Sequence, residues 1–225
     1  GRICGVEALA RIRGRDGRII EAGEFQLAFS DSRNASRLTA RMVELVADTF
    51  RAWQAEDLPI EHVALNLSMA DFQSGDIDER LADAFASRGI DLRHLNIEVT
   101  ESVLMEPHIV RPIDILRRLG VTVALDDFGT GFASLTHLVH FPVDAIKIDR
   151  SFVDRFLTDR PSAAIVEALT DIGRKIGVHI VAEGIETVEQ ASKLTALGCQ
   201  FGQGHLFARP LDAAAITDLL RASLA

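Results

Sequence analysis

The stretch VALDDFGTG, residues 123–131, joins an apolar strand to a glycine-rich turn and places Asp126 and Asp127 at the junction. Neighbouring residues of a strand point to opposite faces, so both aspartates can serve one site only where the chain leaves the strand. Two carboxylates about 4 Å apart repel by about 4 kcal/mol at an effective dielectric constant near 20. The stretch therefore predicts a cation, most simply a divalent metal ion, at the end of this strand.

Outward from this stretch, short apolar runs alternate with longer segments of helical period. The runs expected to form strands are 3–12, 62–68, 95–100, 122–125, 145–148, 179–182 and 201–206. The helices expected between them are 36–55, 77–87, 109–119, 162–176 and 188–197. This alternation is typical of a parallel sheet with helical crossovers. It predicts an α/β fold, a (β/α)8 TIM-like barrel with one strand missed before residue 1 or near Ile19; a doubly wound open sheet is the alternative.

The composition, with 48% hydrophobic and 25% charged residues, fits one globular domain over residues 1–225. No apolar run approaches the roughly 18 residues of a membrane span, so we expect no membrane contact by this domain. The net charge of −9 argues against DNA and other nucleic-acid partners, although metal ions can reverse the local sign for a small phosphorylated ligand. Cys4 and Cys199 are too few for a disulfide framework and favour a reducing cytoplasm.

Polar side chains gather at the expected strand ends. They are Glu7, Asn66, Glu98, Asp126, Asp127, Lys147, Asp149, Glu183, Glu186 and Gln203. Strands often end in polar residues, but the carboxyl ends of barrel strands also form the active-site rim. Carboxylate and amide oxygens suit Mg²⁺ or Mn²⁺ rather than zinc, and their number suits two ions about 3.5–4 Å apart.

Lys147 and Asp149 are two residues apart on an expected strand, so both face inward. A lysine inside an acidic ring can hold a metal-bound hydroxide or a phosphate, or it can simply balance charge.

Two other patterns in the sequence are expected to carry no chemistry. Gly129 and Gly131 resemble the start of a dinucleotide fingerprint, but Ser134 replaces its third glycine and no Walker lysine follows. We expect these glycines to make a mobile loop. Cys199 is expected to be a buried small apolar residue rather than a nucleophile.

In the order of its motifs the chain resembles the EAL-domain family, the cyclic di-GMP phosphodiesterases, from Gly5 to about Pro210. The matching motifs are Glu7-Ala8-Leu9 with Arg11, Asn66-Leu67-Ser68, residues 98–102, DDFGTG at 126–131 with residues 132–135, Lys147-Ile148-Asp149, residues 182–187 and Gln203-Gly204. The resemblance implies a TIM-like barrel modified with one antiparallel strand and a homodimer formed through the region after DDFGTG. It also implies two-metal hydrolysis of cyclic di-GMP to linear pGpG.

The resemblance assigns roles to single residues as well. One metal ion would be held by Glu7, Asn66, Glu98 and Asp126. The second would be held by Asp126, Asp127 and Glu183. The expected catalytic residues are Lys147, Glu183, Glu7 and Asp149. Lys147 would help position the attacking water, and Asp149 would lie close to the water shell of the second metal ion. The expected substrate-binding residues are Arg11, Leu9, Glu186 and Gln203, and the residue expected to anchor the DDFGTG loop is Glu101.

The departures from the family lie in the first connection, residues 13–36. Ile12 replaces the family's tryptophan, the His-Pro pair is absent, and residues 24–29 lack the usual prolines and glutamate. This change bears on guanine contacts, partner binding or regulation more than on the chemistry.

The family's first strand and an initiator Met are also absent, so we expect one EAL domain excised from a longer protein with sensor or GGDEF-type domains. Two other functions stay open: a catalytically inactive EAL domain that acts as a cyclic di-GMP receptor or interaction module, and a barrel enzyme for another phosphoester. No expected metal ligand is missing, which favours an active phosphodiesterase.

Overall fold

The computed structural model describes residues 2–25, 31–129 and 143–224 and divides into two compact units. The first unit contains Gly1–Glu98, Arg111–Val121 and Asp212–Ala225, and the second contains Val99–Val110 and Thr122–Leu211. The end of the DDFGTG stretch and the region expected to form a dimer lie outside the described residues, as does part of the atypical first connection.

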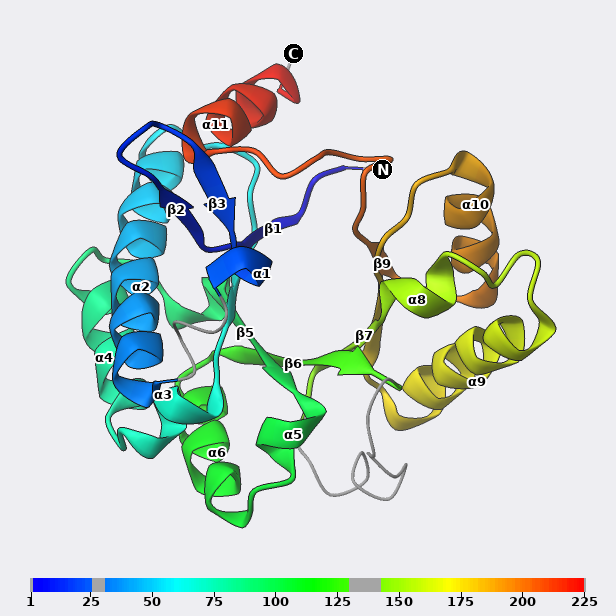
Figure 1. The fold of residues 1–225 in the computed structure, drawn as a ribbon, viewed down its shortest axis with the longest axis horizontal. Helices are drawn as coiled ribbons and strands as arrows, with labels where there is room; N and C mark the ends of the chain where they lie inside the picture. Colours follow the sequence, from blue (N-terminus) through cyan, green and yellow to red (C-terminus); the bar gives the residue numbers. More distant parts are fainter. Residues whose placement is uncertain (1, 26–30, 130–142, 225) are drawn as a thin grey trace. The chain divides into compact units, whose positions relative to one another are not determined.

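Parallel strands with helical crossovers form the first unit (Figure 1). Its elements are β1 Gly5–Ala8, β2 Arg11–Arg13, β3 Ile19–Glu21, α1 Ala22–Phe25, α2 Ser32–Ala55, β4 His62–Asn66, α3 Met69–Gln73, α4 Ile77–Ala86, η2 Leu92–His94, β5 Leu95–Thr100, α6 Val110–Arg118 and α11 Ala213–Ala222. Strands β1, β4 and β5 are neighbours in that order, and both pairs are parallel. Leu95, Ile97 and Val99, which share one face of β5, are all buried.

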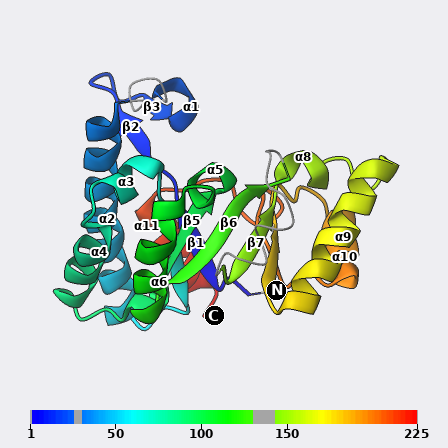
Figure 2. The same cartoon turned by 90° about the horizontal axis from the view of Figure 1, so that it is seen from below.

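Helix α2 supplies much of the core of this unit. It begins at Ser32, earlier than its apolar pattern indicates, because the Asp31 side chain accepts a hydrogen bond from the Arg33 amide. Phe50 and Trp53 on its apolar face are buried, and α4 packs beside it in both views (Figures 1 and 2).

The antiparallel component is a hairpin rather than a strand of the parallel sheet. The apolar run expected to form one strand over 3–12 breaks after Ala8, and β2 then pairs antiparallel with β3 in the register Ile12↔Ile20. The strand suspected near Ile19 is therefore present but lies outside the parallel order. Figure 2 shows the hairpin beside α1.

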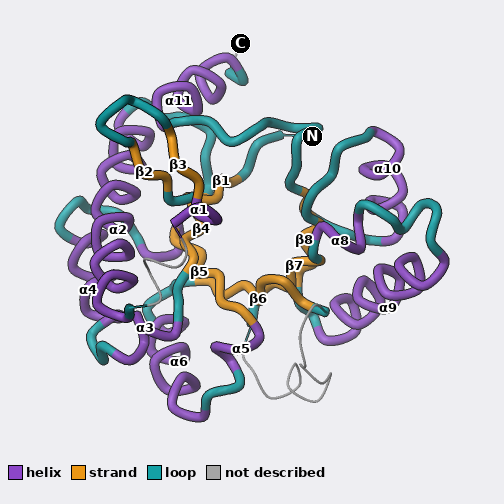
Figure 3. Tube along the Cα trace, viewed as in Figure 1, coloured by secondary structure: helices purple, strands orange, loops and turns teal. Residues whose placement is uncertain are grey.

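The second unit repeats the strand–helix pattern. Its elements are α5 Glu101–Leu104, η3 Pro107–Ile109, β6 Thr122–Phe128, β7 Ala145–Ile148, α8 Arg150–Val153, α9 Arg160–Ile176, β8 His179–Ala182, α10 Val188–Leu197 and β9 Phe201–Gly202. Strands β6, β7, β8 and β9 are parallel neighbours in that order, and α9 packs against β7 and β8 (Figure 3). The strand expected over 201–206 shrinks to two residues.

Local signals set the ends of the helices in the second unit. Asp159 caps α9 by accepting a hydrogen bond from the Ser162 amide, and Gly177 ends that helix in the left-handed conformation, with φ of 75°. Thr187 and Gln190 form a capping box at the start of α10.

Helix α11 is absent from the expected elements, and contacts within the first unit hold it. The Thr217 hydroxyl accepts a 2.8 Å hydrogen bond from the Trp53 indole, and Arg221 makes two bonds to the Glu56 carboxylate. None of the helices in the described parts of the chain has the length and apolar character needed to cross a bilayer.

Candidate metal centre

A β-bulge brings Asp126 and Asp127 to one site. Strand β6 does not end at Leu125 as expected but continues to Phe128, and its register with β7 shifts between Leu125 and Phe128. Asp127 has a φ of 54°, a left-handed conformation that aspartate tolerates better than most residues. The bulge breaks the strict alternation of strand side chains, so both aspartates serve one cluster without the strand ending first.

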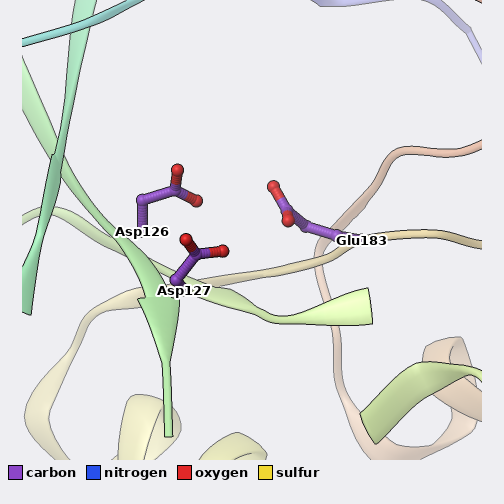
Figure 4. Close-up of side chains that lie close together, drawn as sticks. All are labelled: Asp126, Asp127 and Glu183. Carbon is purple, nitrogen blue, oxygen red and sulfur yellow. The ribbon is translucent and has the colours of Figure 1, made fainter. Parts of the chain in front are cut away.

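Glu183 completes the carboxylate cluster from the end of β8. Asp126, Asp127 and Glu183 each offer an oxygen, and these oxygens lie within 4.8 Å of one another. Figure 4 shows the two aspartates leaving the same strand with their carboxylates toward that of Glu183. The backbone amide of Glu183 donates to the Ile148 carbonyl at 3.1 Å, which keeps the residue in line with the end of β7.

Lys147 is the cation that accompanies these carboxylates. It lies on β7, between β6 and β8 in the sheet order, and is only 1% exposed. Its ammonium nitrogen is 2.6 Å from Glu183 Oε1 and 3.0 Å from Asp126 Oδ1. Asp126 Oδ1 is buried. Its contact with the Lys147 nitrogen is close enough for an ion pair but lacks the geometry of a hydrogen bond.

The donor set fits a hard divalent cation. Three carboxylates whose oxygens lie within 4.8 Å of one another repel, and the buried Asp126 Oδ1 is costly without a hydrogen bond unless something else coordinates it. Oxygen ligands suit Mg²⁺ and Mn²⁺. Asp126, Asp127 and Glu183 could therefore hold such an ion.

A second group of expected ligands lies in the first unit. Asn66 ends β4, where Ser68 caps α3 through its capping box with Asp71. The Asn66 amide nitrogen donates to Glu7 Oε1 at 2.7 Å, and Asn66 pairs with Glu98 across the parallel strands. Glu98 is buried, with 3% exposure. The structure thus brings Glu7, Asn66 and Glu98 together within the first unit.

Asp149 follows directly after β7, which ends at Ile148, and caps α8 by accepting a 3.0 Å hydrogen bond from the Ser151 amide. Its inward orientation beside Lys147 stays a prediction.

The other expected site residues have these surroundings. Glu101 accepts a 2.9 Å hydrogen bond from the Gly129 amide, at the start of the glycine turn. Gln203 accepts from the Ile185 amide through its backbone, and Glu186 forms an ion pair with Arg150. In the first unit, Arg11 bonds the Ala10 carbonyl and Leu9 is 41% exposed.

Cys199, expected to be buried and not a nucleophile, is half-buried. Burial raises the pKa of its thiol to about 11, so little thiolate forms near neutral pH. Arg150, by contrast, carries contacts that the sequence motifs did not single out. Its position directly after the Lys147-Ile148-Asp149 motif is the signal that could have found it.

The chain is similar to known proteins over most of its length. Residues 1–210 match the EAL domain family. The Escherichia coli oxygen sensor protein DosP is 37% identical over 215 residues, which cover 95% of this chain and 27% of that protein. The PaMucR phosphodiesterase in its c-di-GMP complex matches with a TM-score of 0.90 at 32% identity, covering 96% of this chain and 88% of that one. The Klebsiella pneumoniae BlrP1 manganese/cyclic di-GMP complex matches with a TM-score of 0.73 at 25% identity, covering 90% of this chain and 54% of that one.

The chain spans 27% of the length of DosP. The structural similarity confirms the predicted α/β fold class, the modified TIM-like barrel. With most of its length matched, the chain belongs to the EAL domain family.

Proposed function

We propose that this EAL domain is a metal-dependent phosphodiesterase that hydrolyses cyclic di-GMP to linear pGpG. The observation that carries the proposal is the cluster of Asp126, Asp127 and Glu183 around the buried ammonium of Lys147. PaMucR, similar over 96% of the chain, is a phosphodiesterase seen with c-di-GMP.

Two ions, Mg²⁺ or Mn²⁺, would be held by the expected ligands, and the BlrP1 manganese complex supports this choice. Asp126, Asp127 and Glu183 would hold one ion, and Glu7, Asn66 and Glu98 the other, with Asp126 shared. When bound, such ions supply positive charge for an anionic phosphodiester, an activated water and stabilisation of the departing 3′ oxygen.

The chain's own groups prepare this chemistry. Lys147 holds one oxygen of Glu183 and one of Asp126, so it fixes where these carboxylates point before ligand arrives. Its buried ammonium would also help to position the attacking water. Asp149 and Glu7 remain proposed catalytic residues, while Arg11, Leu9, Glu186 and Gln203 would contact the substrate and Glu101 would anchor the loop after Asp127.

The domain would act in bacterial second-messenger signalling as part of a longer cytoplasmic protein. Residues 1–225 would be its EAL domain, and sensor or GGDEF-type domains would regulate it. The similarity to a larger oxygen sensor supports this arrangement. A homodimer is part of the same proposal.

A turnover assay tests the proposal directly. Purified protein with Mg²⁺ or Mn²⁺ and cyclic di-GMP should release pGpG, and chelation of the metal should stop the reaction. Asp126→Asn, which keeps the side chain's shape, should abolish turnover, whereas the exposed Asp171→Asn should not. Near-full activity of Asp126→Asn would refute the metal assignment, and tight binding without turnover by the unaltered protein would favour a cyclic di-GMP receptor.

A further inference from the structure

Arg150 contacts the segment that carries Glu183 and Glu186. It is the first residue of α8, and its aliphatic stem packs against Gly184. A Cβ atom on Gly184 would lie 2.2 Å from Arg150 Cγ, and Gly184 has a φ of 67°. Only glycine fits this position without strain, because the stem of Arg150 fills the space that a side chain at position 184 would need.

The guanidinium of Arg150 holds two carboxylates. Its Nη2 donates to Glu186 Oε1 at 2.8 Å, and its Nε donates to Asp154 Oδ2 at 3.1 Å. The side chain is 52% exposed, so these ion pairs add little to folding stability. Their consequence is geometric, because a planar guanidinium bonded at two points has one orientation.

The backbone around Glu186 is already fixed by other bonds. The Ile185 amide donates to the Gln203 carbonyl at 3.0 Å, and Gln190 Oε1 accepts from the amides of Glu186 and Thr187 at 2.9 Å each. The remaining freedom of Glu186 is therefore in its side chain. Arg150 restricts that freedom, with His205 Nδ1 farther away, at 3.7 Å from the same oxygen.

We infer that Arg150 is a positioning residue for ligand binding, which aims the Glu186 carboxylate at the N–H donors of the ligand's base. The inference rests on the proposed function, in which cyclic di-GMP is the ligand. An ionised carboxylate only accepts hydrogen bonds, so it suits the N–H groups of guanine. The positive charge of Arg150 also offsets the repulsion between Glu186 and an anionic ligand.

A double-mutant cycle between Arg150 and Glu186 tests this assignment. Arg150→Ala should raise the KM for cyclic di-GMP about tenfold, equivalent to about 1.4 kcal/mol, and change kcat less than about twofold. Arg150→Lys should recover part of the loss, because lysine keeps the charge without the fork. Once Glu186→Gln is present, Arg150→Ala should raise KM little further, because both changes break one interaction.

Two controls separate positioning from a general effect. Arg174→Ala removes an exposed arginine that pairs with Asp171 on α9, and it should leave KM and kcat unchanged. Asp154→Ala removes the other partner of the guanidinium and should raise KM less than Arg150→Ala, because the bond to Glu186 remains. Glu186→Gln breaks the ion pair without disturbing the packing on Gly184, so it keeps the test open if Arg150→Ala fails to fold.

Additive effects in the cycle would overturn the assignment, as would a fall in kcat without a rise in KM. If the unaltered protein binds cyclic di-GMP without turnover, the same cycle is measured on Kd by calorimetry with the same expected ratios. If it neither binds nor hydrolyses cyclic di-GMP, the proposed function fails, and with it the ligand of this assignment.

Discussion

Replacing Lys147 with methionine tests the electrostatics of the carboxylate cluster, because methionine keeps most of the length of the side chain and removes its charge. The Lys147 ammonium is 2.6 Å from one carboxylate oxygen and 3.0 Å from another. At an effective dielectric constant of 20, each contact is an attraction of about 6 kcal/mol before desolvation is subtracted. Removing one partner from a buried ion pair costs about 3–5 kcal/mol in measured cases.

We therefore expect Lys147→Met to lower the free energy of unfolding by about 3–5 kcal/mol in the presence of a chelator. Urea unfolding followed by circular dichroism measures this loss. Mn²⁺ at about a hundred times its dissociation constant should restore about 2.7 kcal/mol, because an ion that binds only the folded state stabilises it by mass action.

Lys175→Met is the matched control for this experiment. Lys175 Nζ is 2.6 Å from Asp171 Oδ2, as close as the shorter Lys147 contact, but the lysine side chain is 72% exposed. Solvent screening should make its loss far smaller. Equal stability of Lys147→Met and the unaltered protein in chelator would refute the reasoning, and so would an equal loss in Lys175→Met.

Three further predictions follow from single residues. Gly204→Ala would place a Cβ atom 2.2 Å from the Ile185 carbonyl oxygen, whereas the Cβ added by Gly198→Ala meets nothing within 4 Å. Gly204→Ala should therefore lower the unfolding free energy by more than Gly198→Ala, and thermal denaturation of both variants measures the difference. Burial lowers the pKa of His62, so below about pH 6.5 the unfolded chain binds a proton at this residue more readily than the folded chain does. The free energy of unfolding should therefore fall as the pH falls below about 6.5. Unfolding titrations between about pH 7.5 and 5.5 should show a smaller fall in that free energy for His62→Gln. Because burial raises the pKa of Cys199 to about 11, alkylation mapped to this residue by mass spectrometry at about pH 8 should be slow in the folded protein and fast after unfolding; equal rates would contradict the effect of burial.

Elements with a strong local sequence pattern were predictable from sequence. Strands β5, β7 and β8 and helix α10 have the expected bounds to the residue. Each is an apolar run or periodic segment that ends at a polar residue, glycine or cap, so the local signal and the tertiary structure agree. The capping box of Thr187 and Gln190 is an example in which a local hydrogen-bond pattern alone fixes the first residue of a helix.

Elements that depend on distant contacts were not predictable in the same way. β9 has only two residues, and α11 is held by bonds from Trp53 and Glu56, which lie far away in sequence. The β6 bulge belongs to this class, since a strand's register depends on its partner. The motifs identified Asp126 and Asp127, but only the pairing with β7 shows how neighbouring residues reach one cluster.

The bulge and the buried lysine are two parts of one physical arrangement. Asp127 adopts a left-handed φ, and three carboxylate oxygens lie within 4.8 Å of one another, so the fold maintains both local strain and charge repulsion. Lys147 offsets part of that repulsion but cannot offset all of it. The remaining negative charge lowers folding stability and, for the same reason, raises the affinity for a divalent cation. Folding and metal binding should therefore be thermodynamically linked, and the unfolding free energy should rise with Mg²⁺ or Mn²⁺ concentration even when no substrate is present.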